Sequence, residues 1–140
     1  LSACIGNRLM ENLHSVFMTS FVKLLQNTSS FQSREDEEAF INRMNRASLC
    51  IIDDLGAERG TDYALEKVYN IVDSRYRVGK PVIYTTNLTL AQMKETTDIR
   101  YSRIYDRIFE TCYPVEFKGQ SWRKKEAARR YEDMKSLLED

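Results

Sequence analysis

The stretch Leu49–Gly56 reads Leu-Cys-Ile-Ile-Asp-Asp-Leu-Gly and decides the fold. Its first four residues are all apolar, which is typical of a strand that is buried on both faces of a sheet. Strands of this kind occur in parallel sheets covered by helices. Two carboxylates, Asp53 and Asp54, follow at the carboxyl end of the strand, where open α/β sheets place their ligands. The stretch therefore predicts an α/β fold and a candidate site.

Short apolar runs and longer stretches of helical periodicity alternate along the rest of the chain. We expect strands over 16–18, 49–52, 82–86 and 115–117. Helices are expected over 1–12, from Ser33 to Ala47, from Thr61 to Gly79, over 89–95 and 101–110, and from Ser121 onward. In the helix over 101–110, we expect four side chains to face the core: Ile104, Tyr105, Ile108 and Phe109. In the last helix we expect a buried stripe of Tyr131, Met134, Leu137 and Leu138.

Length and composition indicate one domain over residues 1–140, because 140 residues with 42% hydrophobic content are enough for a single core. The same content excludes a disordered tail. No apolar run approaches the ~18 residues that a membrane span needs, so we expect no membrane partner. The three cysteines form no Cys-x-x-Cys pair, which argues against a zinc site and a disulfide framework. We therefore expect a reducing, cytoplasmic location.

The two neighbouring carboxylates have two interpretations. One aspartate can hold Mg²⁺ while the other orients an attacking water, since Mg²⁺ binds through one or two carboxylates together with substrate phosphates. The run also fits a strand that ends in a solvated turn. Asn87 follows the strand over 82–86, and its amide can hydrogen-bond a water or a phosphate oxygen, although it also fits a turn or helix cap. If the two strands are adjacent, Asn87 lies near Asp54 and both belong to one site.

Four segments resemble, in order, the motifs of AAA+ ATPases of the DnaC/DnaI helicase-loader and IstB-like group. The segment 49–58 resembles Walker B, 85–87 the sensor 1 strand, 103–107 the arginine-finger helix and 121–123 the sensor 2 segment. The resemblance implies a P-loop NTPase (AAA+, RecA-like) fold, with flanking helices and a five-stranded parallel sheet in the order 5-1-4-3-2. It also implies an ATP- and Mg²⁺-dependent homo-oligomer that loads a replicative helicase onto single-stranded DNA.

The resemblance gives roles to the polar residues at the strand ends. Asp53 would be the Mg²⁺ ligand, and Asp54 would polarise the attacking water. Many AAA+ proteins have glutamate at the second position, and aspartate is one methylene shorter. Glu58 is therefore a substitute candidate for activating water. Asn87 would be sensor 1.

Three arginines also match motif positions. Arg107 would project from the flank of the domain and reach the γ-phosphate of a neighbouring subunit, with Arg103 supporting or replacing it. A surface ion pair with Asp106 or Glu110 on the same helix is the alternative for either residue. Arg123 would be sensor 2 and contact the nucleotide of its own subunit.

The family's phosphate-binding loop, Gly-x-x-x-x-Gly-Lys-Ser/Thr, does not occur in the 140 residues. Because this loop supplies most phosphate contacts, we expect the chain alone to be inactive and to bind ATP weakly. The chain also begins in a helical pattern without an initiator Met. We therefore expect an ATPase domain truncated at its N-terminus, lacking the strand that should lie between the strands over 82–86 and 115–117.

Basic residues outnumber acidic ones between Arg100 and Arg130, which suits a single-stranded DNA surface, although solvated basic faces are common. A helicase loader is the main functional hypothesis. One alternative is an IstB-like transposition helper acting on a transposase and double-stranded DNA. Another is a truncated interaction module without ATPase activity.

Overall fold

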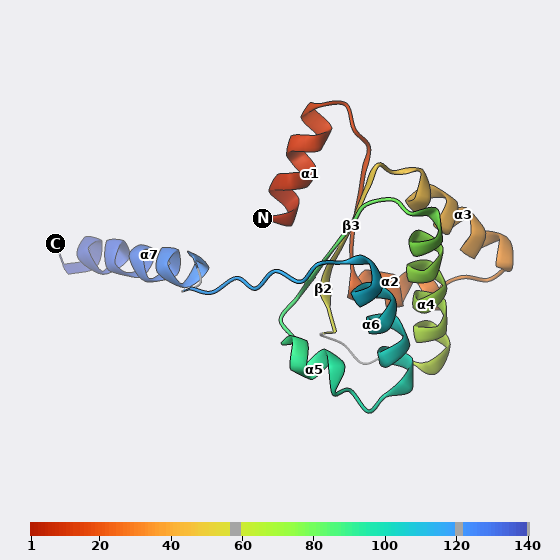
Figure 1. Ribbon diagram of the computed structural model, residues 1–140. Coiled ribbons are helices and arrows are strands. Elements are labelled where there is room, and N and C mark those ends of the chain that lie inside the picture. Colours follow the sequence, from red (N-terminus) through yellow and green to blue (C-terminus); the bar gives the residue numbers. More distant parts are fainter. Residues whose placement is uncertain (57–59, 120–121, 140) are drawn as a thin grey trace.

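The structure, a computed structural model of the chain, describes residues 1–56, 60–119 and 122–139, with side chains described as far as residue 135. One or two helices separate each strand from the next along these ranges (Figure 1). The elements are α1 (Ser2–Glu11), β1 (Val16–Ser20), α2 (Phe21–Ser29), α3 (Arg34–Arg46), β2 (Leu49–Leu55), α4 (Asp62–Val78), β3 (Val82–Thr86), α5 (Leu90–Lys94), α6 (Ile99–Thr111) and α7 (Trp122–Glu139).

The three strands form a parallel sheet in the order β1-β2-β3. The central strand, β2, pairs with β1 from Leu49 onward and with β3 from Cys50 onward. Its residues from Leu49 to Ile52 are at most 4% exposed. Burial raises the pKa of the Cys50 thiol to about 11, so Cys50 behaves as a small core residue. The predicted parallel α/β fold is confirmed. The strand order matches the 4-3-2 part of the expected sheet, in which β3 is strand 4, β2 is strand 3 and β1 is strand 2.

Most of the core lies on one face of the sheet. Helix α4 packs against α2, α3 and α6 on this face (Figure 1). Helix α1 contacts β1 and β2, and a Cβ on Gly6 would lie 3.2 Å from Cδ1 of Ile51, so glycine permits this close approach. The core includes Phe21, Leu24, Leu65, Val68, Ile71, Ile104, Tyr105 and Ile108.

Two predicted helix starts are confirmed by capping side chains. Ser33 accepts a hydrogen bond from the Asp36 amide at 3.2 Å and forms a reciprocal capping box with it. Thr61 caps α4 by accepting from the Ala64 amide at 3.2 Å. Helix α4 ends at Val78 and is capped by Gly79, whose φ of 66° lies in the left-handed region that glycine adopts without strain.

Helix α2 is a feature that the sequence analysis does not predict. Ser20 caps it by accepting from the Lys23 amide at 3.3 Å. Its buried residues recur at three and four positions, as in an amphipathic helix: Phe21, Leu24, Leu25 and Thr28. The apolar spacing is visible in the sequence. No turn residue separates the helix from β1, however, so nothing marks where the helix begins.

Two expectations about the C-terminal part are wrong. The segment 115–117 is not a strand, and Val115 and Phe117 are 70% and 77% exposed. In the described ranges β3 pairs with β2 alone, so this segment has no adjacent strand to satisfy its backbone groups. The expected stripe of α7 is not buried either, since Tyr131 is 71% and Met134 is 64% exposed.

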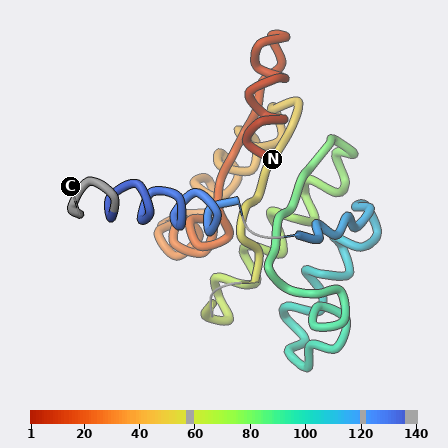
Figure 2. Tube along the Cα trace, turned by 90° about the vertical axis from the view of Figure 1, so that its left-hand side faces the viewer, coloured from red at the N-terminus to blue at the C-terminus, as the bar shows by residue number. Residues whose placement is uncertain are grey.

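Helix α7 extends away from the sheet in both views (Figures 1 and 2). Helical periodicity identifies an apolar face but does not show what covers it, which explains the wrong expectation. Ser121 lies outside the described residues, and Leu137 and Leu138 lie outside the described side chains. In the part of the chain that the structure describes, no helix is long and apolar enough to span a membrane.

A buried arginine joins α3, α4 and the sheet. Arg75 of α4 is 1% exposed, and its guanidinium donates hydrogen bonds to four backbone carbonyls. The acceptors are the carbonyls of Met44 (3.1 Å), Ala47 (3.1 Å), Ser48 (3.5 Å) and Pro81 (2.6 Å). Burial lowers the pKa of Arg75, while the carbonyls at the C-terminal end of α3 form the negative end of the helix dipole and favour the cation.

We predict that Arg75→Met lowers the free energy of unfolding by about 3 kcal/mol or more, because several buried carbonyls lose their donor. Urea unfolding followed by circular dichroism measures the change. Arg77→Met is the matched control, because Arg77 lies on the same helix but its ion pair with Asp73 is largely exposed on the arginine side and should contribute below about 1 kcal/mol. Equal losses in the two variants would contradict the assignment.

Candidate functional site

The two aspartates lie at an irregularity in β2. Ile52 pairs with Tyr84 and Leu55 with Thr86, so Asp53 and Asp54 together oppose one residue of β3. This is the pattern of a β-bulge, and Asp54 has a φ of 61°. In a regular strand the two side chains would point to opposite faces. The bulge interrupts that alternation and leaves Asp53 half-buried and Asp54 exposed at the same edge.

Side chains from β3 contact both carboxylates. The Thr85 hydroxyl donates to Oδ1 of Asp53 and accepts a hydrogen bond from the Asp54 amide at 3.0 Å. The Asn87 side-chain amide donates to Oδ1 of Asp54 at 3.2 Å. The expected proximity of Asn87 and Asp54 is therefore observed. Thr85 is a site residue that sequence reasoning missed, although its place two residues before Asn87 in the segment 85–87 was a signal for it.

The turn after the strands is held by a second threonine. The Thr86 hydroxyl donates to the Leu55 carbonyl at 2.7 Å and accepts from the Leu88 amide at 3.0 Å. Gly56 has a φ of 85°, and a Cβ at this position would collide with the Leu88 side chain. The ends of β2 and β3 are thus fixed relative to each other, which keeps Asp53, Asp54 and Asn87 in one cluster.

Asp53 and Asp54 are the residues of this cluster that could hold a cation. In the described part of the chain, no three Asp, Glu, His or Cys side chains gather as a metal site. A cation held by Asp53 would therefore complete its coordination with phosphate oxygens and water, as Mg²⁺ commonly does. Glu58, the substitute candidate for activating water, lies outside the described residues.

Arg107 does not project freely from the flank of the domain. Its Nε lies 2.8 Å from Oδ1 of Asp73 on α4, and its Nη1 lies 2.9 Å from Oε2 of Glu110. Its guanidinium also lies over the Tyr76 ring, 4.8 Å from the ring centroid. Hydrogen bonds to Tyr69 and Glu110 raise the pKa of Arg107. The arginine is therefore folded back onto α4.

The other two arginines are exposed. Arg103 stacks on the Tyr69 ring at 4.2 Å from its centroid. Arg123 lies near the start of α7, which extends away from the sheet (Figure 1). The structure thus brings together Asp53, Asp54 and Asn87, and it does not bring Arg123 to them.

The parallel sheet with its flanking helices has the fold of P-loop NTPases of the AAA+ kind. A crystal structure of DnaI supports this fold with a TM-score of 0.66 at 21% identity, over 81% of this chain and 63% of that one. The chain belongs to the family of IstB-like ATP binding proteins, whose model matches residues 1–130.

Two curated relatives are longer than this chain. The phage-like element PBSX protein XkdC of Bacillus subtilis is 33% identical over 90 residues, which are 61% of this chain and 33% of the relative. The replicative helicase loader DnaI of the same organism is 25% identical over 134 residues, covering 86% of this chain and 42% of DnaI. The chain therefore spans less than half the length of these relatives.

We predict that Thr85→Val lowers the free energy of unfolding by about 1–2 kcal/mol, because the Asp54 amide and the Asp53 carboxylate both lose a partner while side-chain volume is kept. Thr85→Ser retains the hydroxyl and should restore most of the loss. Chemical denaturation measures both variants. A serine variant as unstable as the valine variant would show that the methyl group, and not the hydroxyl, matters here.

Proposed function

We propose that the chain is part of an ATP-dependent helicase loader of the DnaC/DnaI type. The observation that carries the proposal is the contact between Asn87 and Asp54 across the ends of adjacent strands, in a chain of the IstB-like ATP-binding family. An amide and a carboxylate in contact can position one water between them and a phosphate. The similarity to a replicative helicase loader supports the choice of partner.

In this proposal Asp53 binds Mg²⁺ with the phosphates of ATP, and Asp54 orients the attacking water. Asn87 hydrogen-bonds the water or the γ-phosphate, and Arg123 contacts the nucleotide of its own subunit after α7 has moved. The phosphate-binding loop is contributed from outside the 140 residues, so the chain alone does not hydrolyse ATP. The assays below therefore use a protein that contains this chain together with such a loop.

The proposed partners are a replicative helicase, single-stranded DNA and further copies of the protein. Within the basic region, Arg100 is paired with Asp62 and Asp98, and Arg107 with Asp73 and Glu110. The basic residues near the start of α7 are exposed, as is Trp122 beside them: Arg123, Lys124, Lys125, Arg129 and Arg130. This distribution favours α7 over α6 as the contact for a DNA strand.

An IstB-like transposition helper is the second candidate, and the family match favours it. The two functions differ in partner, so co-sedimentation with a replicative helicase or with a transposase separates them. Preference for single-stranded over double-stranded DNA separates them again. A truncated interaction module is the third candidate, and calorimetric titration of the loop-containing protein with Mg·ATP would show no binding in that case.

The acids are tested by single amide substitutions in the loop-containing protein. We predict that Asp54→Asn slows ATP hydrolysis while ATP binding is kept, because the amide is a poor acceptor for the proton of the attacking water. Asp53→Asn should instead weaken Mg²⁺-dependent nucleotide binding. Turnover assays and calorimetry measure the two effects. Hydrolysis at the parent rate in Asp54→Asn would transfer the role to another residue, with Glu58 tested first.

The arginine finger is tested by mixing variants. We predict that Arg107→Ala lowers turnover by on the order of 10³ or more with little loss of ATP binding, since a finger stabilises charge on the transferred phosphoryl group. Mixing Arg107→Ala with Asp54→Asn protein should restore ATPase activity, because a mixed interface combines an intact site with an intact finger. Mixed oligomers without recovery would make Arg103 the better candidate.

A further inference from the structure

A pocket lies between α4, α6 and the amino end of β3, whereas the two aspartates lie at the carboxyl end of β2. It has a volume of about 310 Å³, at the lower end of the ~300–1,000 Å³ range of ligand sites. Three cationic side chains line it: Arg75, Lys80 and Arg107. In the described part of the chain, no carboxylate lines it. The pocket is therefore a candidate for a small anion.

Two of the three cations have no acidic partner. Arg75 donates to backbone carbonyls before β2 and β3, and Lys80 donates to the carbonyls of Asn45 and Arg46. Carbonyl groups accept hydrogen bonds but carry no net charge. Within the described ranges neither Arg75 nor Lys80 forms a salt bridge, so both positive charges lack a counter-ion.

The charge of Arg75 is the more costly to leave without a counter-ion, because this side chain is 1% exposed. Its Nε is buried and, among the described residues, has no hydrogen-bond partner. Burial lowers the pKa of Arg75, since a low-dielectric surrounding disfavours the charged form. An anion in the adjoining pocket would favour the charged form again.

Arg107, the third cation of the pocket, is already paired. It contacts Asp73 and Glu110, and Asp73 also pairs with Arg77. Together with the two cations that lack acidic partners, four cations face two carboxylates, which leaves an excess of two positive charges. A phosphate monoester carries about 1.5 to 2 negative charges at neutral pH, whereas a carboxylate carries one. The excess therefore matches a phosphate better than a carboxylate.

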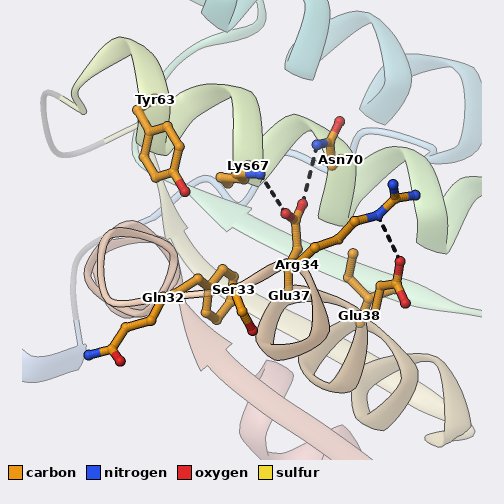
Figure 3. Close-up of a pocket in the computed structure, with 10 residues that line it drawn as sticks. Gln32, Ser33, Arg34, Glu37, Glu38, Tyr63, Lys67 and Asn70 are labelled. Carbon is orange, nitrogen blue, oxygen red and sulfur yellow. Dashed lines mark hydrogen bonds and ion pairs between the residues drawn. The ribbon is translucent and has the colours of Figure 1, made fainter.

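The larger pocket between α3 and α4, of about 490 Å³, has no such excess (Figure 3). Lys67 pairs with Glu37 at 2.6 Å, and Arg34 pairs with Glu38 at 3.0 Å. All four of these side chains line that pocket, so its charges cancel. The charge argument for an anion applies to the pocket beside β3 and not to this one.

We propose that the pocket at the amino end of β3 binds a small phosphate monoester with an apolar or aromatic body. Lys80 and Arg107 contact the phosphate, because ammonium and guanidinium groups form strong charge-assisted hydrogen bonds with phosphate oxygens. Arg75 acts through its electric field, since its Nε is covered by protein atoms. The body of the ligand lies against Val82 and Tyr84, which also line the pocket.

The first test is calorimetric titration of the 140-residue chain with phenyl phosphate, benzoate and inorganic phosphate. Phenyl phosphate should bind at least tenfold more tightly than benzoate, which has the same ring but one charge. Inorganic phosphate lacks the ring and should also bind more weakly than phenyl phosphate. No binding of phenyl phosphate, or a second probe that matches its affinity, would overturn the proposal.

The second test changes one lysine at a time, with circular dichroism to verify folding. Lys80→Met removes a charge from the pocket and should weaken binding of phenyl phosphate at least tenfold, whereas Lys80→Arg keeps the charge and most of the affinity. Lys23→Met is the matched control, because Lys23 is exposed on α2 and does not line the pocket. Equal losses in the two methionine variants, or in both Lys80 variants, would contradict the proposal.

The third test locates the ligand on the unaltered chain, so it does not depend on how well a variant folds. The amide resonances of Gly79, Val82 and Thr111, which line the pocket, should shift when phenyl phosphate is added. Resonances of Asp54 and Asn87 should stay in place. Shifts at Asp54 and Asn87 alone would assign the phosphate to the strand-end cluster and overturn the proposal of a separate site.

Discussion

The buried guanidinium of Arg75 is the interaction on which the arrangement of the sheet and helices depends. A guanidinium that is 1% exposed is costly to bury unless it makes hydrogen bonds. Here its hydrogen bonds go to carbonyls at the end of α3, just before β2 and just before β3. Lys80 adds bonds to the carbonyls of Asn45 and Arg46 at 2.8 and 3.2 Å. The two cations thus hold the amino ends of β2 and β3 and the end of α3 together.

The site at the other end of the sheet follows from this alignment. The Pro81 carbonyl accepts from Arg75 and also from the Cys50 amide at 3.1 Å, which sets the pairing of β2 with β3. The register then runs without interruption to Ile52 and Tyr84 before the bulge. With the register fixed, Thr85 faces both aspartates and Asn87 follows within reach of Asp54. A shift of one residue would turn each of these side chains to the opposite face.

The sequence predicted what depends on local pattern and missed what depends on neighbours. The buried run of β2, the cap at Thr61 and the proximity of Asn87 and Asp54 follow from periodicity, capping chemistry and strand adjacency. Arg75 lies in an amphipathic helix like any surface arginine, and only its three-dimensional surroundings show that it is buried. The segment 115–117 has strand-like alternation, but a strand forms only beside a partner. Tyr131 and Met134 likewise form an apolar stripe, but helical periodicity does not show what packs against it.

The position of Arg107 limits which nucleotide its guanidinium can contact. It lines a pocket with Pro81 and Val82 at the amino end of β3, whereas Asn87 follows the carboxyl end. Five strand residues at ~3.3 Å each separate these ends by roughly 16 Å, farther than an arginine side chain reaches. Arg103 lies four residues, about 6 Å, nearer the start of α6. Arg107 therefore does not reach the Asp54–Asn87 cluster of its own chain, and any contact with a phosphate requires it to leave Asp73.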